Sequence, residues 1–244
     1  MLEKHFIDAL KKARQIVFFT GSGISAESGI PTFRGEEGLW NKFKPEELAN
    51  FNAFIKNPAL VTEWYNFRRE IVRKALPNPG HLSIYEFEKF YDVTVVTQNV
   101  DNLHRRAGSS KVLELHGNIE RNFCISCGKD AVEMHEKDKS GVFRCECGGL
   151  LRPGVVWFGE NLPTAIFDAA EVAISKSDIV FVAGTSLQVY PAASLVHFAK
   201  GFNCYIVEIN TETTPGSYLA DQKFEGKSGV HIPAILELVK ELKG

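Results

Sequence analysis

The chain contains 244 residues, of which 44% are hydrophobic and 24% are charged, and its formal net charge is −2. These values are ordinary for a globular protein and exclude a disordered chain, which would need fewer apolar residues and a larger net charge. The near-neutral charge gives no global attraction to nucleic acids or membranes, and no apolar run reaches the roughly eighteen residues of a membrane-spanning helix. We therefore predict binding to neither, and expect one large α/β domain with at most a small satellite.

Strands and helices alternate along most of the chain. Residues 1–10 have the spacing of an amphipathic helix and carry acids where a signal peptide needs an apolar core, so a cytoplasmic protein is expected. Runs rich in Val, Ile and Phe predict buried parallel strands at 16–20, 93–97, 178–183 and 204–209. Helices are predicted at 163–175, 191–199 and 233–242, each with a proline near its start. This alternation predicts a Rossmann-like, doubly wound parallel sheet.

Two segments interrupt the alternation and are too long to be ordinary connections. Residues 35–75 hold aromatic side chains at mostly helical spacing, and residues 119–153 hold four of the five cysteines. We predict that these two segments form a smaller domain, made of a helical module and a metal-binding module. The larger domain then comprises residues 1–34, 76–118 and 154–244.

Small or polar residues follow each of the four predicted strands. They are Gly21-Ser22-Gly23, Gln98-Asn99-Val100-Asp101, Gly184-Thr185-Ser186 and Asn210-Thr211-Glu212. Open α/β sheets bind their ligands at the carboxyl ends of their strands. Four such loops therefore predict one shared crevice.

The first of these loops fits the dinucleotide-binding pattern G-x-G-x-x-G/A with residues 21–26. Glycine allows a tight turn and close approach of the backbone to a pyrophosphate, although the pattern alone also fits a structural turn. A dehydrogenase would continue into a full helix and a second strand ending in an acid. Here Gly29-Ile30-Pro31 ends the helix within about two turns, which argues against hydride transfer and for a loop that folds back over the cofactor.

The cysteines form two close pairs, Cys124-x-x-Cys127 and Cys145-x-Cys147, separated by seventeen residues. Four thiolates suit tetrahedral Zn²⁺ and leave no open position for water, so we predict one structural zinc ion per chain. Gly148 and Gly149 directly follow the unusually short second pair and give its backbone freedom. Four reduced cysteines without metal, or His135 as a substitute ligand, are the alternatives. Cys204 stands alone in an apolar run and is predicted to be a buried, small hydrophobic residue.

Residues 21–34, 97–101, 116–117, 184–186 and 209–210 together resemble the motifs of the sirtuins, in the same order along the chain. The resemblance implies an NAD-dependent protein-lysine deacylase. In that reaction the acyl oxygen attacks the nicotinamide ribose, a base then activates a ribose hydroxyl, and the products are lysine, nicotinamide and O-acyl-ADP-ribose. Ser22 departs from the alanine that is usual in the family, and Cys145-x-Cys147 departs from the commoner C-x-x-C.

The resemblance implies His116 as the base, with Asn99 and Asp101 contacting the nicotinamide ribose and carboxamide. From the residues alone, a histidine at a strand end is more often structural, and Asp101 also suits a helix cap. From the residues alone, Phe33 would also fit a position in the core, and Arg34 would also fit a solvated loop. The full set of NAD-binding positions implied by the resemblance is Gly21, Ser22, Gly23, Ser25, Ala26, Glu27, Ile30, Thr32, Phe33, Arg34, Trp40, Gln98, Asn99, Val100, Asp101, Gly184, Thr185, Ser186, Asn210, Thr211, Glu212 and Ser228. His81 and His104 lack the motif and are predicted to be packing or surface residues.

Tyr65 and Arg68 are three residues apart in a predicted helix and therefore share a face. Their Tyr-x-x-Arg pattern resembles the class III sirtuins, which remove succinyl and malonyl groups, and Arg68 would hold the terminal carboxylate. Spacing alone favours a solvated helix face. The segment Val155, Val156, Trp157, Phe158, Gly159 and Glu160 resembles the one along which the acyl-lysine peptide lies as an added strand, and it also fits an ordinary core strand.

Three functions remain open at this point. The leading one is an NAD-dependent desuccinylase and deacetylase that acts on acyl-lysine proteins or peptides. The second is a mono-ADP-ribosyltransferase, and the third is a non-enzymatic NAD-sensing zinc module, against which the presence of His116 argues.

Overall fold

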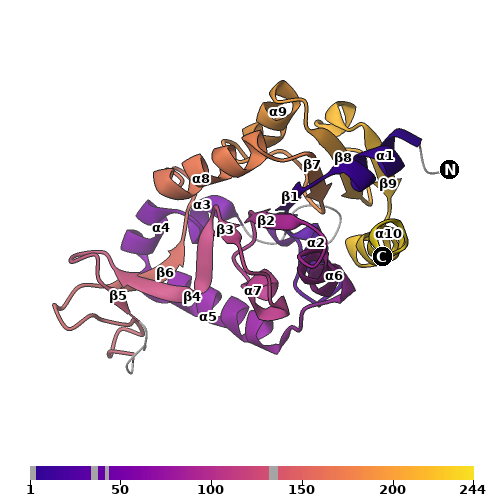
Figure 1. The fold of residues 1–244 in the computed structure, drawn as a ribbon. Helices are drawn as coiled ribbons and strands as arrows, with labels where there is room; N and C mark the ends of the chain where they lie inside the picture. Colours follow the sequence, from indigo (N-terminus) through magenta and orange to yellow (C-terminus); the bar gives the residue numbers. More distant parts are fainter. Residues whose placement is uncertain (1–3, 34–37, 42–43, 132–136) are drawn as a thin grey trace.

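The computed structural model describes residues 4–33, 38–41, 44–131 and 137–244, and within them a six-stranded parallel sheet forms the centre of the molecule (Figure 1). Its strands in spatial order are β3 (Val112–Glu114), β2 (Asp92–Thr97), β1 (Gln15–Thr20), β7 (Ile179–Ala183), β8 (Tyr205–Asn210) and β9 (Gln222–Glu225). Numbered within this sheet alone, the order is 3-2-1-4-5-6, that of the Rossmann fold. The predicted doubly wound sheet is therefore confirmed.

Helices cover both faces of this sheet, and alternate residues of β1 point to opposite faces. Ile16 and Phe18 pack into a core shared with α1 (Lys4–Lys12), α6 (Pro79–Phe87) and α10 (Ser228–Lys243). Val17 and Phe19 pack into a second core with α8 (Thr164–Ser175) and α9 (Ser194–Gly201). Burial on both faces is the reason that the central strands are continuous apolar runs. No described helix is long and apolar enough to cross a bilayer.

Two helix starts differ from prediction. The chain makes a turn at residues 191–193, closed by a hydrogen bond from the Ser194 amide to the Pro191 carbonyl, so α9 begins three residues later than expected. Helix α10 begins at Ser228, five residues early, and Pro233 lies inside it. Its first turn is closed by the amides of Val230 and His231, which both donate to the Lys227 carbonyl.

The two interrupting segments pack against each other beside the sheet. The first holds η1 (Leu39–Asn41), α3 (Pro45–Leu48), α4 (Phe51–Lys56) and α5 (Pro58–Lys74), which confirms a helical module. The second holds an antiparallel sheet, in the order β5 (Asp130–Ala131), β4 (Gly117–Cys124) and β6 (Leu151–Val155). A third core joins α4 and α5 to β4 and β6. The cysteine-bearing loops lie at the end of the molecule away from α1 and α10 (Figure 1). The domain boundaries given above stay a prediction.

One buried charge ties α5 to β4. Arg69 is only 3% exposed; its Nε donates to the Ile119 carbonyl over 2.6 Å, Nη1 donates to Asn66 over 2.8 Å, and Nη2 donates to Asn122. Burial lowers the pKa of Arg69 to about 10, so the guanidinium stays charged at neutral pH. The two modules are therefore joined by a buried cation that donates hydrogen bonds, as well as by apolar contact.

Replacing Arg69 by Met should lower the free energy of unfolding by about 3 kcal/mol, because the Ile119 and Asn122 acceptors lose their donor inside the protein. Chemical denaturation measures this directly. Arg73→Met removes the same charge from the exposed last turn of α5 and should change the unfolding free energy by less than about 0.5 kcal/mol. Equal effects of the two substitutions would contradict the structural role of Arg69.

Candidate active site at the carboxyl ends of the strands

A cavity of about 480 Å³ lies where β1, β2, β7 and β8 end. It is lined by all four of the loops that follow the predicted strands, as expected from the sequence. The predicted residues in its wall are Gly21, Ser22, Gly23, Thr32, Phe33, Tyr65, Arg68, Gln98, Asn99, Val100, His116, Val156, Trp157, Phe158, Gly159, Glu160, Gly184, Thr185, Ser186, Asn210, Thr211 and Glu212.

The loops after β1 and β7 approach each other so closely that side chains are excluded. The Gly23 amide donates to the Gly184 carbonyl over 2.8 Å, and a Cβ built on Gly23 would lie 2.7 Å from the Gly184 Cα. Gly184 itself has φ +61°, in the left-handed region that favours glycine. β1 and β7 are the adjacent strands between which the strand order of the sheet reverses. The glycines are therefore required by contact between two loops at the place where such sheets bind their ligands.

Asn99 and Asp101 follow β2 and belong to one buried network beneath the cavity. The Asn99 side-chain amide donates to the Gly21 carbonyl over 3.0 Å and to Ser25 Oγ over 3.2 Å. Ser25 donates to Asp101 Oδ2 over 2.7 Å, and Asp101 Oδ1 accepts the Leu103 amide of α7 (Leu103–Ala107) over 2.9 Å. Asp101 thus accepts the first amide of α7, in keeping with its other predicted role, although the N-cap position itself is Asn102. Burial raises the pKa of the Asp101 carboxyl, opposed by these hydrogen bonds.

His116 lies in the wall of the cavity just before β4 begins. Its Nδ1 is 3.0 Å from the Gln98 carbonyl, and because a carbonyl only accepts, Nδ1–H is the donor. In the neutral ring Nε2 is then left unprotonated and able to take a proton. Burial lowers the pKa of His116 below its ordinary 6.5, partly offset by the Gln98 hydrogen bond, so the ring is neutral at pH 7.

His81 and His104 are packing residues. Both are at most 2% exposed, and their rings lie 4.9 Å apart. His104 Nε2 is hydrogen-bonded to the Thr20 hydroxyl over 2.9 Å, and His81 Nε2 lies 3.5 Å from Ser25 Oγ. Burial lowers the pKa of His81 to about 4, so it stays neutral at neutral pH.

Tyr65 and Arg68 of α5 are buried in the cavity wall, which excludes the alternative of a solvated helix face; Tyr65 is 2% exposed and Arg68 8%. The Arg68 guanidinium carbon lies 4.7 Å from the Phe33 ring centroid, 4.9 Å from that of Trp64 and 5.8 Å from that of Tyr65. Burial lowers the pKa of Arg68, which is nevertheless charged at any ordinary pH.

Residues 156–160 continue beyond the end of β6 along the rim of the cavity and are not a regular core strand. The Val156 amide donates to the His116 carbonyl, and the Phe158 amide to the Ala49 carbonyl, both over 2.9 Å. The Phe158 side chain is 42% exposed. Glu160 forms a two-pronged ion pair with the buried guanidinium of Arg152, which fixes this end of the segment.

Some predicted positions do not line the cavity. Ser25 and Asp101 lie in the network beneath it, Ala26 and Glu27 are exposed, and Ile30 and Ser228 are buried elsewhere. Arg34 lies outside the described residues, as does the side chain of Trp40. The NAD-contact roles of all these positions stay predictions.

Several lining residues were not predicted from the sequence. Most follow the same strand ends a few residues further along, so extending each loop would have included them. They are Ala49, Leu162, Gln188, Val189, Tyr190, Pro191, Thr213, Thr214 and Pro215.

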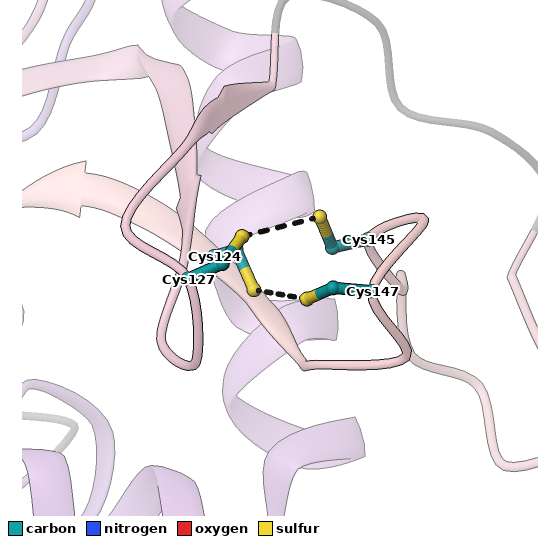
Figure 2. Close-up of side chains that lie close together, drawn as sticks. All are labelled: Cys124, Cys127, Cys145 and Cys147. Carbon is teal, nitrogen blue, oxygen red and sulfur yellow. Dashed lines mark hydrogen bonds between the residues drawn. The ribbon is translucent and has the colours of Figure 1, made fainter.

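The four predicted zinc ligands converge at the tip of the antiparallel sheet, with all four sulfurs within 4.8 Å of one another (Figure 2). Cys124 Sγ lies 3.5 Å from Cys147 Sγ, and Cys127 Sγ lies 3.7 Å from Cys145 Sγ. These separations are far longer than a disulfide bond and close to the roughly 3.8 Å edge of a tetrahedron with Zn–S bonds of about 2.3 Å.

The short second pair reaches this geometry through the glycines that follow it. Gly148 has φ +86°, and a Cβ at Gly149 would lie 2.6 Å from Cys124 Sγ. The donor set therefore fits one structural zinc ion, held by Cys124, Cys127, Cys145 and Cys147. His135 lies outside the described residues.

The model of the Sir2 family matches residues 21–191. An NAD-dependent protein deacylase from Aquifex aeolicus is 48% identical over 231 residues, which are 94% of this chain and 97% of that protein. A crystal structure of a Sir2 homologue in complex with NAD matches with a TM-score of 0.92 and 41% identity, covering 100% of this chain and 96% of the other. A Sir2 complex with a p53 peptide and NAD⁺ matches at 0.86 and 34%, covering 99% and 98%.

Freshly purified protein should contain about one zinc ion per chain by elemental analysis, and Cys127→Ser should lose most of it. The loss follows because three thiolates and a hydroxyl bind zinc far more weakly than four thiolates. Cys204→Ala is the matched control, since Cys204 is buried under α8 against the Ile174 carbonyl and away from the cluster. A wild-type chain without zinc would contradict the assignment.

Proposed function

The chain belongs to the Sir2 family, and we propose that it removes succinyl and malonyl groups, as well as acetyl groups, from lysine side chains of proteins. The acyl group passes to ADP-ribose, which gives free lysine, nicotinamide and O-acyl-ADP-ribose. The coarser activity, NAD-dependent protein deacylation, is supported by relatives that match nearly the whole chain at close to half identity. The finer acyl preference is supported by the wall of the cavity.

The observation that carries the acyl preference is the buried cation of Arg68. It faces the cavity and forms no hydrogen bond or ion pair with any residue that the structure describes. The charge of Asp101 acts on it through space, but both Asp101 oxygens already accept hydrogen bonds from Ser25 and Leu103. A buried guanidinium without a bonded counter-ion is costly, and a ligand carboxylate removes that cost.

A succinyl or malonyl group ends in the carboxylate that Arg68 lacks, whereas an acetyl group does not. Two parallel N–H···O bonds from a guanidinium recognise a carboxylate with defined orientation. A site built for a charged partner discriminates strongly against an analogue without it, because its own polar groups then stay unpaired. The aromatic rings of Phe33, Trp64 and Tyr65 limit the movement of Arg68 and so favour one orientation of the acyl chain.

The loops after the four strands fit NAD as the co-substrate. Gly21 and Gly23 line the cavity at the start of a helix, where a pyrophosphate would approach the backbone, and Ser22, Thr185, Ser186 and Asn210 add hydroxyl and amide groups to the same wall. Asn210 is itself oriented by donating to the Thr185 carbonyl over 2.9 Å. When bound, NAD supplies the ribose carbon that accepts the acyl oxygen.

The chain's own groups then orient the reactants and move protons. Neutral His116, with Nε2 free, is suited to take the proton of a ribose hydroxyl. Asn99 is held by two hydrogen bonds from its amide and keeps its carbonyl oxygen for a ligand. Residues 156–158 run along the rim of the cavity before the turn at Gly159 and would offer their backbone to a substrate peptide, which would explain the acceptance of many peptide sequences. A cytoplasmic location belongs to the same proposal, since thiolate zinc ligands are typical of a reducing compartment.

Incubation with NAD and matched acetyl- and succinyl-lysine peptides, followed by mass analysis of every product, tests the activity. O-acyl-ADP-ribose together with free lysine is the expected result. ADP-ribosylated protein in its place would establish the transferase alternative.

Arg68→Met should reduce kcat/KM for a succinyl-lysine peptide at least about 100-fold more than for the acetyl peptide of the same sequence, because only the first loses a bidentate ion pair. The ratio of the two kcat/KM values is the measurement. Arg73→Met removes the same charge from the exposed end of α5 and should leave that ratio unchanged. Equal losses for both peptides in Arg68→Met would remove the carboxylate-binding role.

The pH profile of kcat/KM should rise to a plateau with an apparent pKa below 6.5, because burial lowers the pKa of His116 and the base is lost only as the pH falls through that value. His116→Ala should lower kcat/KM by about 10² to 10⁴ and abolish this acidic limb. An acidic limb that persists in His116→Ala, or one centred above pH 7, would assign the base elsewhere.

A further inference from the structure

Trp157 packs between the rim of the cavity and the core that the two modules share. Its backbone amide donates to Glu160 Oε2 over 2.8 Å, and the guanidinium carbon of Arg152 lies 3.4 Å from its ring centroid. The Phe54 ring packs 5.3 Å from the indole. Arg152 is itself fixed by its ion pair with Glu160. The indole therefore has a guanidinium and a phenyl ring packed against it, and these contacts orient its N–H.

That N–H is directed at Tyr65. Trp157 Nε1 lies 2.8 Å from the Tyr65 hydroxyl oxygen in the buried wall of the cavity. An indole nitrogen only donates, so the Tyr65 oxygen is the acceptor and its own proton must turn elsewhere. Within the part of the chain that the structure describes, no acceptor takes that proton.

We propose that Trp157 is a positioning residue for acyl selectivity: its indole N–H turns the Tyr65 hydroxyl so that the phenolic proton is offered to the carboxylate held by Arg68. This inference rests on the proposed function, since it concerns the same acyl group. It assigns Trp157 a role separate from lining the path of the peptide backbone.

Two physical effects give the contact its influence. A hydroxyl without a fixed donor rotates between several directions, and fixing it beforehand avoids that loss of freedom when a ligand binds. Accepting a hydrogen bond also polarises a hydroxyl and strengthens the bond that it donates, most of all in a buried site of low dielectric. Both effects act on a carboxylate ligand, whereas an acetyl methyl group has nothing to accept the proton.

The test is a double-mutant cycle of Trp157→Phe and Tyr65→Phe, assayed with matched succinyl- and acetyl-lysine peptides at saturating NAD. Phenylalanine keeps an aromatic ring beside Arg152 but removes the N–H. We expect Trp157→Phe to lower the succinyl-to-acetyl ratio of kcat/KM about tenfold, mainly through the succinyl KM. In the Tyr65→Phe background the same substitution should lower the ratio no further, because the hydroxyl through which it acts is gone.

Equal effects of Trp157→Phe on both peptides, or additive effects in the double variant, would overturn the inference and leave Trp157 as a packing residue. Arg68→Met separates this failure from failure of the proposed function. A selective Arg68→Met with an unselective Trp157→Phe refutes only the role of Trp157, whereas an unselective Arg68→Met refutes the acyl preference itself.

Trp157 is almost fully buried, so thermal unfolding and zinc content must first show that each variant folds. If Trp157→Phe does not fold, the wild-type chain still decides the question by NMR. Of the indole N–H signals of its three tryptophans, the one that Tyr65→Phe displaces furthest reports on Trp157, because that N–H donates directly to the Tyr65 hydroxyl. We expect that signal to shift more on titration with the succinyl peptide than with the acetyl peptide, and equal shifts would overturn the inference.

Discussion

The close contact between the loops that follow β1 and β7 is the constraint on which the rest of the site depends. Gly23 and Gly184 meet at a distance that excludes any Cβ, at the point where the strand order of the sheet reverses. The Gly21 carbonyl in the same loop accepts the Asn99 side chain, so the loop after β2 is placed by the same contact. Three strand ends are thereby fixed relative to one another, and the cavity keeps its shape without a ligand.

Burial then decides the charge state of the groups around that cavity. Low dielectric disfavours the charged form of each group, which keeps His116 neutral and raises the pKa of Asp101. Asp101 is compensated by two hydrogen bonds from within the chain. Among the described residues, Arg68 contacts aromatic faces and feels the charge of Asp101 through space, but it has no hydrogen-bonded counter-ion, and this distinguishes it from the fully bonded carboxylate of Asp101.

The sequence predicts the centre of the fold better than its margins. The four inner strands are buried on both faces and read as apolar runs, whereas the edge strands β3 and β9 have three and four residues and no such run. The loops at the strand ends were found because each follows an inner strand. The burial of Arg68 could not be predicted, because Arg68-Arg69-Glu70 looks solvated until Phe33 and Trp64 are brought over it by the tertiary fold. The Trp157–Tyr65 contact joins residues 92 positions apart and leaves no local pattern.

Strand β4 connects the cavity, the zinc site and the helical module, which lie far apart along the sequence. It begins directly after His116 at the cavity and ends at Cys124 in the zinc site, and between them Ile119 and Asn122 accept the hydrogen bonds of Arg69 from α5. The neighbouring strand β6 leads into the segment that holds Trp157. The same helix that places Arg69 against β4 places Tyr65 and Arg68 in the cavity wall. A zinc ion held by the four cysteines would therefore stabilise the strand that begins beside His116 and against which α5 and β6 pack.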